Sequence, residues 1–172
     1  MRLSRIVFLL AGLVATCVFS EKYASGQAAR IFRNATYLMG NEYGVQAATL
    51  VDGVHDEPYL YVRYGDQYVY GDFNGDGLKD AAVILMENNG GTAEWYALAF
   101  LINDGKKLVH KASRPLDDRA IIKSLKIKNH KVIVDMYVHR EWDSMGGPTR
   151  RVKNIYDYQS PSLDIVAPLW AP

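Results

Sequence analysis

Alternation of apolar and polar residues with a period of two is the feature of this chain that most constrains its fold. Residues 131–139 show it most clearly, and their alternate apolar positions would face one side of a strand. Similar runs rich in Tyr, Val and Ile recur along the chain, separated by Gly, Asn and Asp at turn spacing. This pattern predicts a mainly β protein with a single antiparallel β-sheet meander, an α+β arrangement being the alternative. We expect one β-rich domain at residues 28–158 and a proline-containing C-terminal tail at residues 159–172.

A continuous apolar run at residues 81–86 departs from this alternation. A strand of this kind is buried on both faces, so we expect it at the centre of the sheet. Residues 28–38 are expected to begin as a short helix or turn. The other expected strands are residues 46–51, 59–63, 67–70, 95–102, 107–113, 120–128, 131–139 and 150–158. The expected turns and breaks are residues 65–66, 103–105, 114–119 and 129–130.

The first 20 residues have the pattern of an export signal. Arg2 and Arg5 precede an apolar run at residues 6–19, which is shorter than the roughly 20 residues of a membrane-spanning helix. Small residues predict cleavage after Ser20, or later near Gly26. We therefore exclude this signal peptide from the fold and expect an exported, secreted chain with no transmembrane span after cleavage.

Cys17 is the only cysteine. The residues before it loosely resemble a bacterial lipoprotein box, so one interpretation is a lipid anchor on Cys17. The alternative is an apolar residue within a discarded signal, in which case the mature chain has neither thiol nor disulfide. Both interpretations place the domain outside the cytoplasm, in the periplasm or the extracellular space.

The charge balance is close to neutral. The chain carries 20 basic and 19 acidic residues, and cleavage after Ser20 would remove Arg2 and Arg5. Such a balance gives no electrostatic reason to expect a nucleic-acid partner. The basic residues are also dispersed, and the pair Arg150 and Arg151 is interpreted as part of a solvated strand face.

Residues 72–80 carry the strongest chemical signal. Carboxylate or amide side chains occupy positions one, three and five of this segment, and Gly77 at position six permits a sharp turn. Calcium requires six to eight oxygen ligands, which alternate positions of a tight loop can supply. We therefore predict a calcium site. Its predicted ligands are the side chains of Asp72, Asn74, Asp76 and Asp80 and the backbone carbonyl of Leu78.

Two other kinds of loop share part of this pattern, the EF-hand and the plain turn. An EF-hand needs a bidentate Glu at position twelve, but that position is Val83. A plain turn also favours Asp, Asn and Gly, but three carboxylates within nine residues would repel one another without a cation. Magnesium fits less well than calcium, because it prefers few protein ligands and retains its waters. The loop resembles the calcium loops of integrin-like FG-GAP repeats, which link two antiparallel strands.

Residues 139–143 form the most reactive-looking cluster outside that loop. They combine His139, Glu141, Trp142 and Asp143 before a glycine pair, a set that could perform acid/base chemistry on a sugar. Glu94 and residues 117–119 raise the same possibility. The alternative interpretation is a solvated loop or strand end, since no partner nucleophile is identifiable by spacing.

Five further segments form a pattern that is shared with known proteins: residues 34–37, 49–53, 70–83, 87–92 and 145–150. In these segments the chain resembles a group of small bacterial exported proteins and lipoproteins of unassigned function, with looser similarity to the mycobacterial LppP/LprE lipoproteins. The resemblance covers most of residues 34–158 and implies a bacterial cell-envelope domain with a GD-x-NGDG-x-x-D segment. A Cys pair often precedes Pro-Thr in these relatives, where this chain has Gly146 and Gly147, so no disulfide or metal role of that loop carries over.

Two functions follow as expectations. The first is a non-enzymatic envelope module, stabilised by calcium, that binds a glycan or protein partner of the cell envelope through exposed aromatics. The aromatic candidates are Tyr59, Tyr61, Trp95 and Trp142. The alternative is a periplasmic glycan hydrolase that uses Glu141, Asp143 or Glu94.

Overall fold

The structure is a computed structural model that describes residues 26, 29–41, 44–144 and 147–159. The expected signal segment with Cys17, and residues 160–172 of the expected tail, lie outside the described residues. Of the described residues, 62% lie in strands and 5% in helix. This confirms the prediction of a mainly β fold and decides against α+β. Within the described ranges, no helix has the length and apolar character needed to cross a membrane.

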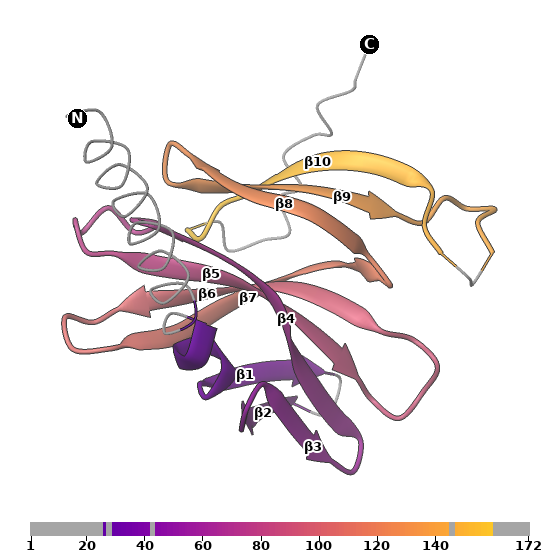
Figure 1. Ribbon diagram of the computed structural model, residues 1–172, viewed down its shortest axis with the longest axis horizontal. Coiled ribbons are helices and arrows are strands. Elements are labelled where there is room, and N and C mark those ends of the chain that lie inside the picture. Colours follow the sequence, from indigo (N-terminus) through magenta and orange to yellow (C-terminus); the bar gives the residue numbers. More distant parts are fainter. Residues whose placement is uncertain (1–25, 27–28, 42–43, 145–146, 160–172) are drawn as a thin grey trace, which may run out of the picture.

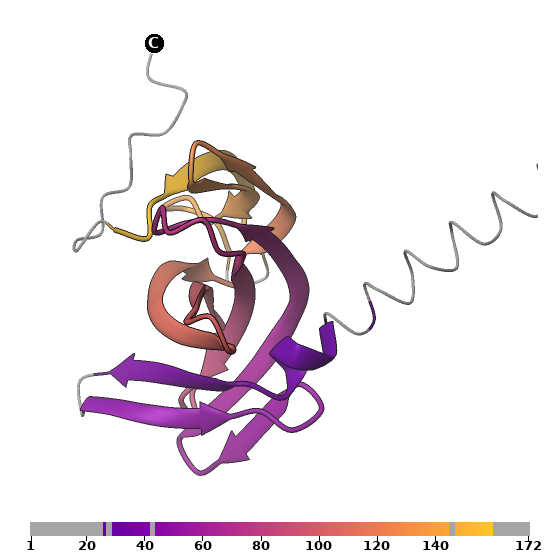
Figure 2. The same cartoon turned by 90° about the vertical axis from the view of Figure 1, so that its left-hand side faces the viewer.

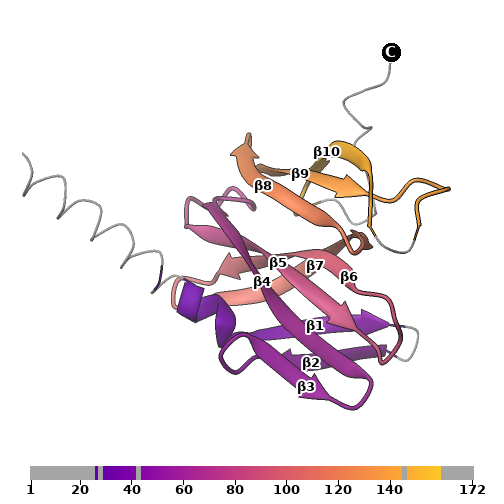
Figure 3. The same ribbon diagram turned by 45° about the vertical axis from the view of Figure 1, so that its right-hand side comes forward.

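The ten strands pair antiparallel in three sheets rather than one. A central sheet has the order β3-β4-β5-β6-β7, a second has the order β10-β9-β8, and β1 pairs with β2 as a hairpin. Figures 1, 2 and 3 show three layers, with β8–β10 over one face of the central sheet and the β1–β2 hairpin over the other. The strands are β1 (Thr36–Asn41), β2 (Gly44–Thr49), β3 (Val54–Glu57), β4 (Leu60–Gly71), β5 (Asp80–Asn88), β6 (Trp95–Asn103), β7 (Leu108–Asp118), β8 (Ile121–Lys128), β9 (Lys131–Val138) and β10 (Arg150–Tyr156).

Strand β5 is buried on both faces, as its continuous apolar run predicts. It is the middle strand of the central sheet, and successive side chains of a strand point to opposite faces. Val83 and Leu85 belong to a core shared with β1, β2 and a short helical turn at residues 29–33. Ala82 and Ile84 belong to a second core shared with β8, β9 and β10. Strand β5 therefore contributes side chains to both hydrophobic cores.

The turn predicted at Gly65 and Asp66 is wrong, because β4 runs without a break from Leu60 to Gly71. The pairing of β4 with β5 instead shifts register between Tyr64 and Tyr68, and Asp66 takes a φ of 58° within this bulge. A bulge adds a residue to one strand without ending it. The turn-forming residues are thus used for a local irregularity inside a long strand.

The break predicted at residues 114–119 is also wrong for most of its length, since β7 continues to Asp118. Pro115 pairs with Ala97 within the ladder. It is tolerated because β7 is an edge strand of the central sheet, where one side of the backbone has no strand neighbour.

Strands β1 and β3 were not expected. The first half of β1 lies at positions where the sequence predicts a helix or turn, and β3 has only four residues. Tyr37 and Met39 of β1 are buried against the central sheet, so tertiary packing decides this segment. The predicted hairpin turn at Asn129 and His130 is confirmed, with φ values of 51° and 60° at the two residues, as a primed two-residue turn requires.

Candidate functional site

The predicted calcium loop joins β4 to β5 at one end of the central sheet. Gly75 and Gly77 have φ values of 81° and 82°, a conformation that glycine adopts without steric cost. Phe73 fixes the loop to the domain: it is 2% exposed, and its ring lies 5.2 Å from that of Phe100 in an edge-to-face contact. The loop is therefore attached to the core between β5 and the β8–β10 sheet.

Backbone amides of the loop hold the side-chain oxygens of three predicted ligands. Each oxygen that accepts one N–H bond keeps a second lone pair, so these contacts orient the oxygens without exhausting them. The donors to Asn74 and Asp76 lie two residues after the acceptor, as in Asx turns, and the two donors to Asp72 lie three and five residues after it. The bonds run from Gly75 N to Asp72 Oδ1 (2.7 Å), Gly77 N to Asp72 Oδ2 (3.1 Å), Asp76 N to Asn74 Oδ1 (3.1 Å) and Leu78 N to Asp76 Oδ1 (2.7 Å).

Asp80, the fourth predicted side-chain ligand, has a different environment. Its side chain is fully buried. Phe73 N donates to its Oδ2 at 2.8 Å, and Asn103 N donates to its Oδ1 at 2.9 Å. Asp80 thus ties the loop to the distant end of β6, a role that the spacing of residues 72–80 did not indicate.

Two side chains from other segments bind the outside of the loop. His130 Nδ1 lies 2.6 Å from the backbone oxygen of Asp72, and Gln159 Nε2 donates to the backbone oxygen of Asn74 at 3.2 Å. His130 belongs to the β8–β9 turn and Gln159 follows β10. The loop is therefore held by the central sheet on one side and by the β8–β10 sheet on the other.

The structure brings Asp72, Asn74, Asp76 and Leu78 together in this one loop, with Asp80 beneath it. In the part of the chain that the structure describes, no three His, Cys, Asp or Glu side chains are grouped as in a metal site. Two of the predicted ligands, the Asn74 side-chain amide and the Leu78 backbone carbonyl, are not among the groups that this criterion counts. The calcium site remains a prediction.

The second candidate cluster lies in the segment between β9 and β10. Asp143 closes this loop at its base: Arg140 N and Thr149 N donate to its Oδ2 at 2.9 and 2.8 Å, and Thr149 Oγ1 donates to its Oδ1 at 2.7 Å. The bond from the Arg140 amide and those from Thr149 hold the pKa of the Asp143 carboxyl below its ordinary value. A carboxyl of this kind is a poor proton donor to a glycosidic oxygen, so its contacts favour an anchoring role.

Residues 117–119 connect this loop to the central sheet. His139 N donates to Asp117 Oδ2 at 2.7 Å, Glu94 N donates to Asp118 Oδ1 at 2.8 Å, and Arg119 pairs with Asp118 at 2.5 Å. Glu94 takes part through its backbone. These contacts favour a structural role for residues 117–119.

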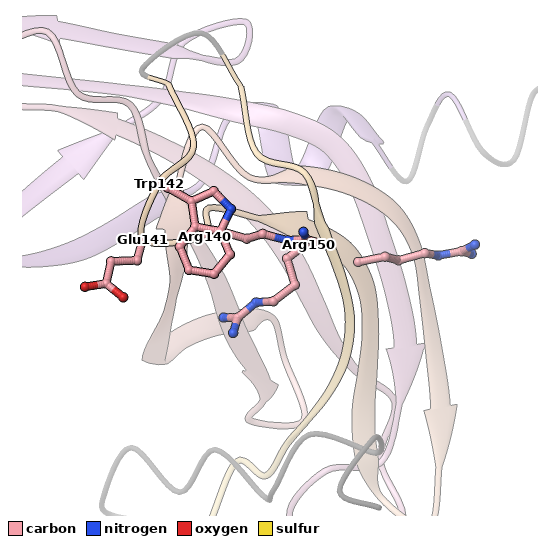
Figure 4. A pocket seen from close by; sticks show the side chains of 5 residues that line it. Arg140, Glu141, Trp142 and Arg150 are labelled. Carbon is pink, nitrogen blue, oxygen red and sulfur yellow. The ribbon is translucent and has the colours of Figure 1, made fainter.

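A hollow opens beside the loop that Asp143 closes. The described residues that line it are Arg140, Glu141, Trp142, Arg150 and Arg151 (Figure 4). The sequence places Arg150 and Arg151 on a solvated strand face, because nothing in it indicates that they lie next to Trp142. The pairing of Arg150 with Val138 across the β9–β10 hairpin brings them there.

Comparison of the chain with protein-family models, with curated proteins and with solved structures finds no match.

Proposed function

We propose that this chain is an exported cell-envelope module, of a binding or structural kind, whose β4–β5 loop binds a structural calcium ion. The observation that carries the proposal is the arrangement of oxygens in that loop. The side chains of Asp72, Asn74 and Asp76 accept hydrogen bonds from the amides of their own loop, which leaves oxygens available to a hard cation.

Electrostatics supports an ion in this place. Asp72 and Asp76 lie in a loop of nine residues, and the buried carboxylate of Asp80 lies beneath them. Like charges at this spacing repel one another, and a divalent cation would convert the repulsion into attraction. Because the loop is fixed to two sheets, calcium would act as a clip between them. Extracellular calcium modules commonly bind with a Kd of about 0.1–1 mM.

The glycan-hydrolase alternative has less support from the contacts. A glycosidase of the usual kind needs two carboxyl groups facing one bond, roughly 5–9.5 Å apart. Asp143 uses both carboxylate oxygens to close its own loop, and Glu94 is absent from the described residues that line the hollow. Only Glu141 of the three candidates lies there. We therefore favour a module that binds without turnover.

Thermal unfolding in calcium, magnesium and a chelator tests the proposal. At a calcium concentration about 100 times Kd, binding to the folded chain alone stabilises it by about 2.7 kcal/mol, which raises Tm by roughly 5–10 °C for a domain of this size. Asp76→Asn should abolish most of this rise. Asp104→Asn is the matched control, because Asp104 also accepts two backbone amides in an exposed turn but lies outside the loop.

An unchanged Tm in calcium for the wild-type chain would contradict the calcium proposal. A parallel panel of cell-wall and storage glycans tests the choice between the two functions. Release of reducing ends by the wild-type chain, and its loss in Glu141→Gln, would favour the hydrolase over the binding module.

A further inference from the structure

The hollow at the end of the β9–β10 hairpin has the dimensions of a small-ligand site. Its volume is about 510 Å³, within the range of roughly 300–1,000 Å³ that is common for ligand pockets. In Figure 4 the indole of Trp142 and the side chains of Arg140 and Arg150 gather around it, and the carboxylate of Glu141 lies away from the indole. All five side chains of its lining are polar or aromatic.

Two of the three arginines have guanidinium groups available to a ligand. Arg151 is occupied, because its Nε and one terminal nitrogen each donate to the Asp135 carboxylate at 2.9 Å. Among the described residues, Arg140 and Arg150 form no ion pair and donate no side-chain hydrogen bond. A guanidinium offers a planar fork of donors that matches a carboxylate. The hollow therefore presents two forks that are not hydrogen-bonded to a carboxylate, and the charge of Arg140 also helps to lower the pKa of Asp143.

The aromatic part of the lining is exposed and lies next to the base of the loop. Trp142 is 77% exposed, a large apolar face left in solvent. It directly precedes Asp143, which accepts three hydrogen bonds, from Arg140 N, Thr149 N and Thr149 Oγ1, at the base of the loop.

An acidic group limits which anion can bind. Glu141 lines the hollow, so a bare polyanion would meet repulsion as well as attraction. A ligand with one negative charge and several hydroxyls avoids this conflict. Its carboxylate would face an arginine fork, and a hydroxyl could donate to the Glu141 carboxylate.

We propose that this hollow binds a carboxylate-bearing sugar, with Arg140 and Arg150 on the carboxylate, Trp142 against the ring and Glu141 on a hydroxyl. An acidic sugar satisfies all four side chains, because its ring has an apolar face, hydroxyls and one charge. The inference deepens the proposed function by assigning a ligand class to a binding module. It rests on that module being non-enzymatic, and it does not depend on calcium.

Calorimetric titration of the full exported chain with two matched disaccharides tests the inference. Cellobiouronic acid and cellobiose differ by one carboxylate in place of a hydroxymethyl group. The acid should bind at least tenfold more tightly than cellobiose. Arg150→Gln should remove most of this difference, and Trp142→Ala should weaken binding of the acid at least tenfold.

Two control variants separate the site from general surface effects. Arg30→Gln removes an exposed arginine, and Tyr59→Ala removes a side chain that is 82% exposed, both outside the residues that line the hollow. Neither should change the affinity. Unfolding curves of all four variants should match the wild type, since every substituted side chain is exposed. Arg140→Gln gives a second test of the carboxylate contact if Arg150→Gln is unstable.

Three results would overturn the inference. Equal affinity for the two disaccharides would show that the arginines do not recognise the carboxylate. Binding of acetate or inorganic phosphate as tightly as cellobiouronic acid would show that the sugar ring contributes nothing to binding. Absence of binding by cellobiouronic acid, with calcium binding intact, would refute the ligand class and leave the calcium module standing. Cleavage of cellobiouronic acid would instead contradict the non-enzymatic function.

Discussion

Replacement of Asp80 by Ala should destabilise the domain strongly, and without any contribution from calcium. The side chain is fully buried, and its two oxygens accept the amides of Phe73 and Asn103 at 2.8 and 2.9 Å. A buried donor left without a partner costs about 1–3 kcal/mol. The loss of both acceptors therefore predicts a decrease of about 2–6 kcal/mol in the free energy of unfolding. Asp80→Asn keeps one acceptor and should cost about half as much.

Urea unfolding in the presence of a chelator measures this effect free of bound calcium. Asp104→Ala provides the control, because Asp104 also accepts two backbone amides, those of Lys106 and Lys107, each at 2.9 Å. Its turn is exposed, so water can replace the lost acceptor and the change should be much smaller. A loss for Asp80→Ala no greater than that for Asp104→Ala would refute the assignment of Asp80 as a buried anchor.

Two further predictions concern the core. Burial lowers the pKa of His110 to about 4, and its neutral Nδ1 accepts the amide of Leu38 at 2.9 Å. In the unfolded chain this histidine is protonated below about pH 6.5, so up to about 3 kcal/mol of stability should be lost as pH falls from 6.5 to 4. His110→Asn should therefore reduce the change of the urea midpoint with pH over that window. A pH dependence as steep as that of the wild type would contradict this prediction. A Cβ at Gly65 would lie 2.7 Å from Ile84 Cγ2, so Gly65→Ala should lower the free energy of unfolding, measured with urea, by about 1–3 kcal/mol. Gly91→Ala is the control, because a Cβ at Gly91 meets no atom within 4 Å, and it should leave the stability nearly unchanged.

Those parts of the fold that depend on local pattern could be predicted from the sequence. The continuous apolar run in β5 predicted that this strand lies in the middle of the central sheet. Asn129 and His130 predicted a hairpin turn. Features that depend on which strands are neighbours in the sheet could not be predicted from local sequence. Gly65 with Asp66 has turn chemistry but forms a bulge, and Pro115 has breaker chemistry but lies on an edge strand. Sheet order, which decides both outcomes, is a property of the whole chain.

The same distinction applies to the candidate sites. The spacing of residues 72–80 predicted a compact loop with three oxygens at alternate positions, because such turns are built from local hydrogen bonds. It could not predict the bond from Asn103 to Asp80, which spans 23 positions, or the contact of His130 with Asp72. The meeting of Trp142 with Arg150 also depends on the register of the β9–β10 hairpin.

Calorimetric titration of the metal-free chain with calcium tests the central claim most directly. One ion per chain should bind, with a Kd of about 0.1–1 mM as in other extracellular calcium modules. Asp72→Asn should weaken binding at least tenfold, and Asp104→Asn should leave it unchanged. No heat of binding at millimolar calcium by a chain that unfolds cooperatively, or equal binding by the wild type and Asp72→Asn, would contradict the assignment of the β4–β5 loop as a calcium site.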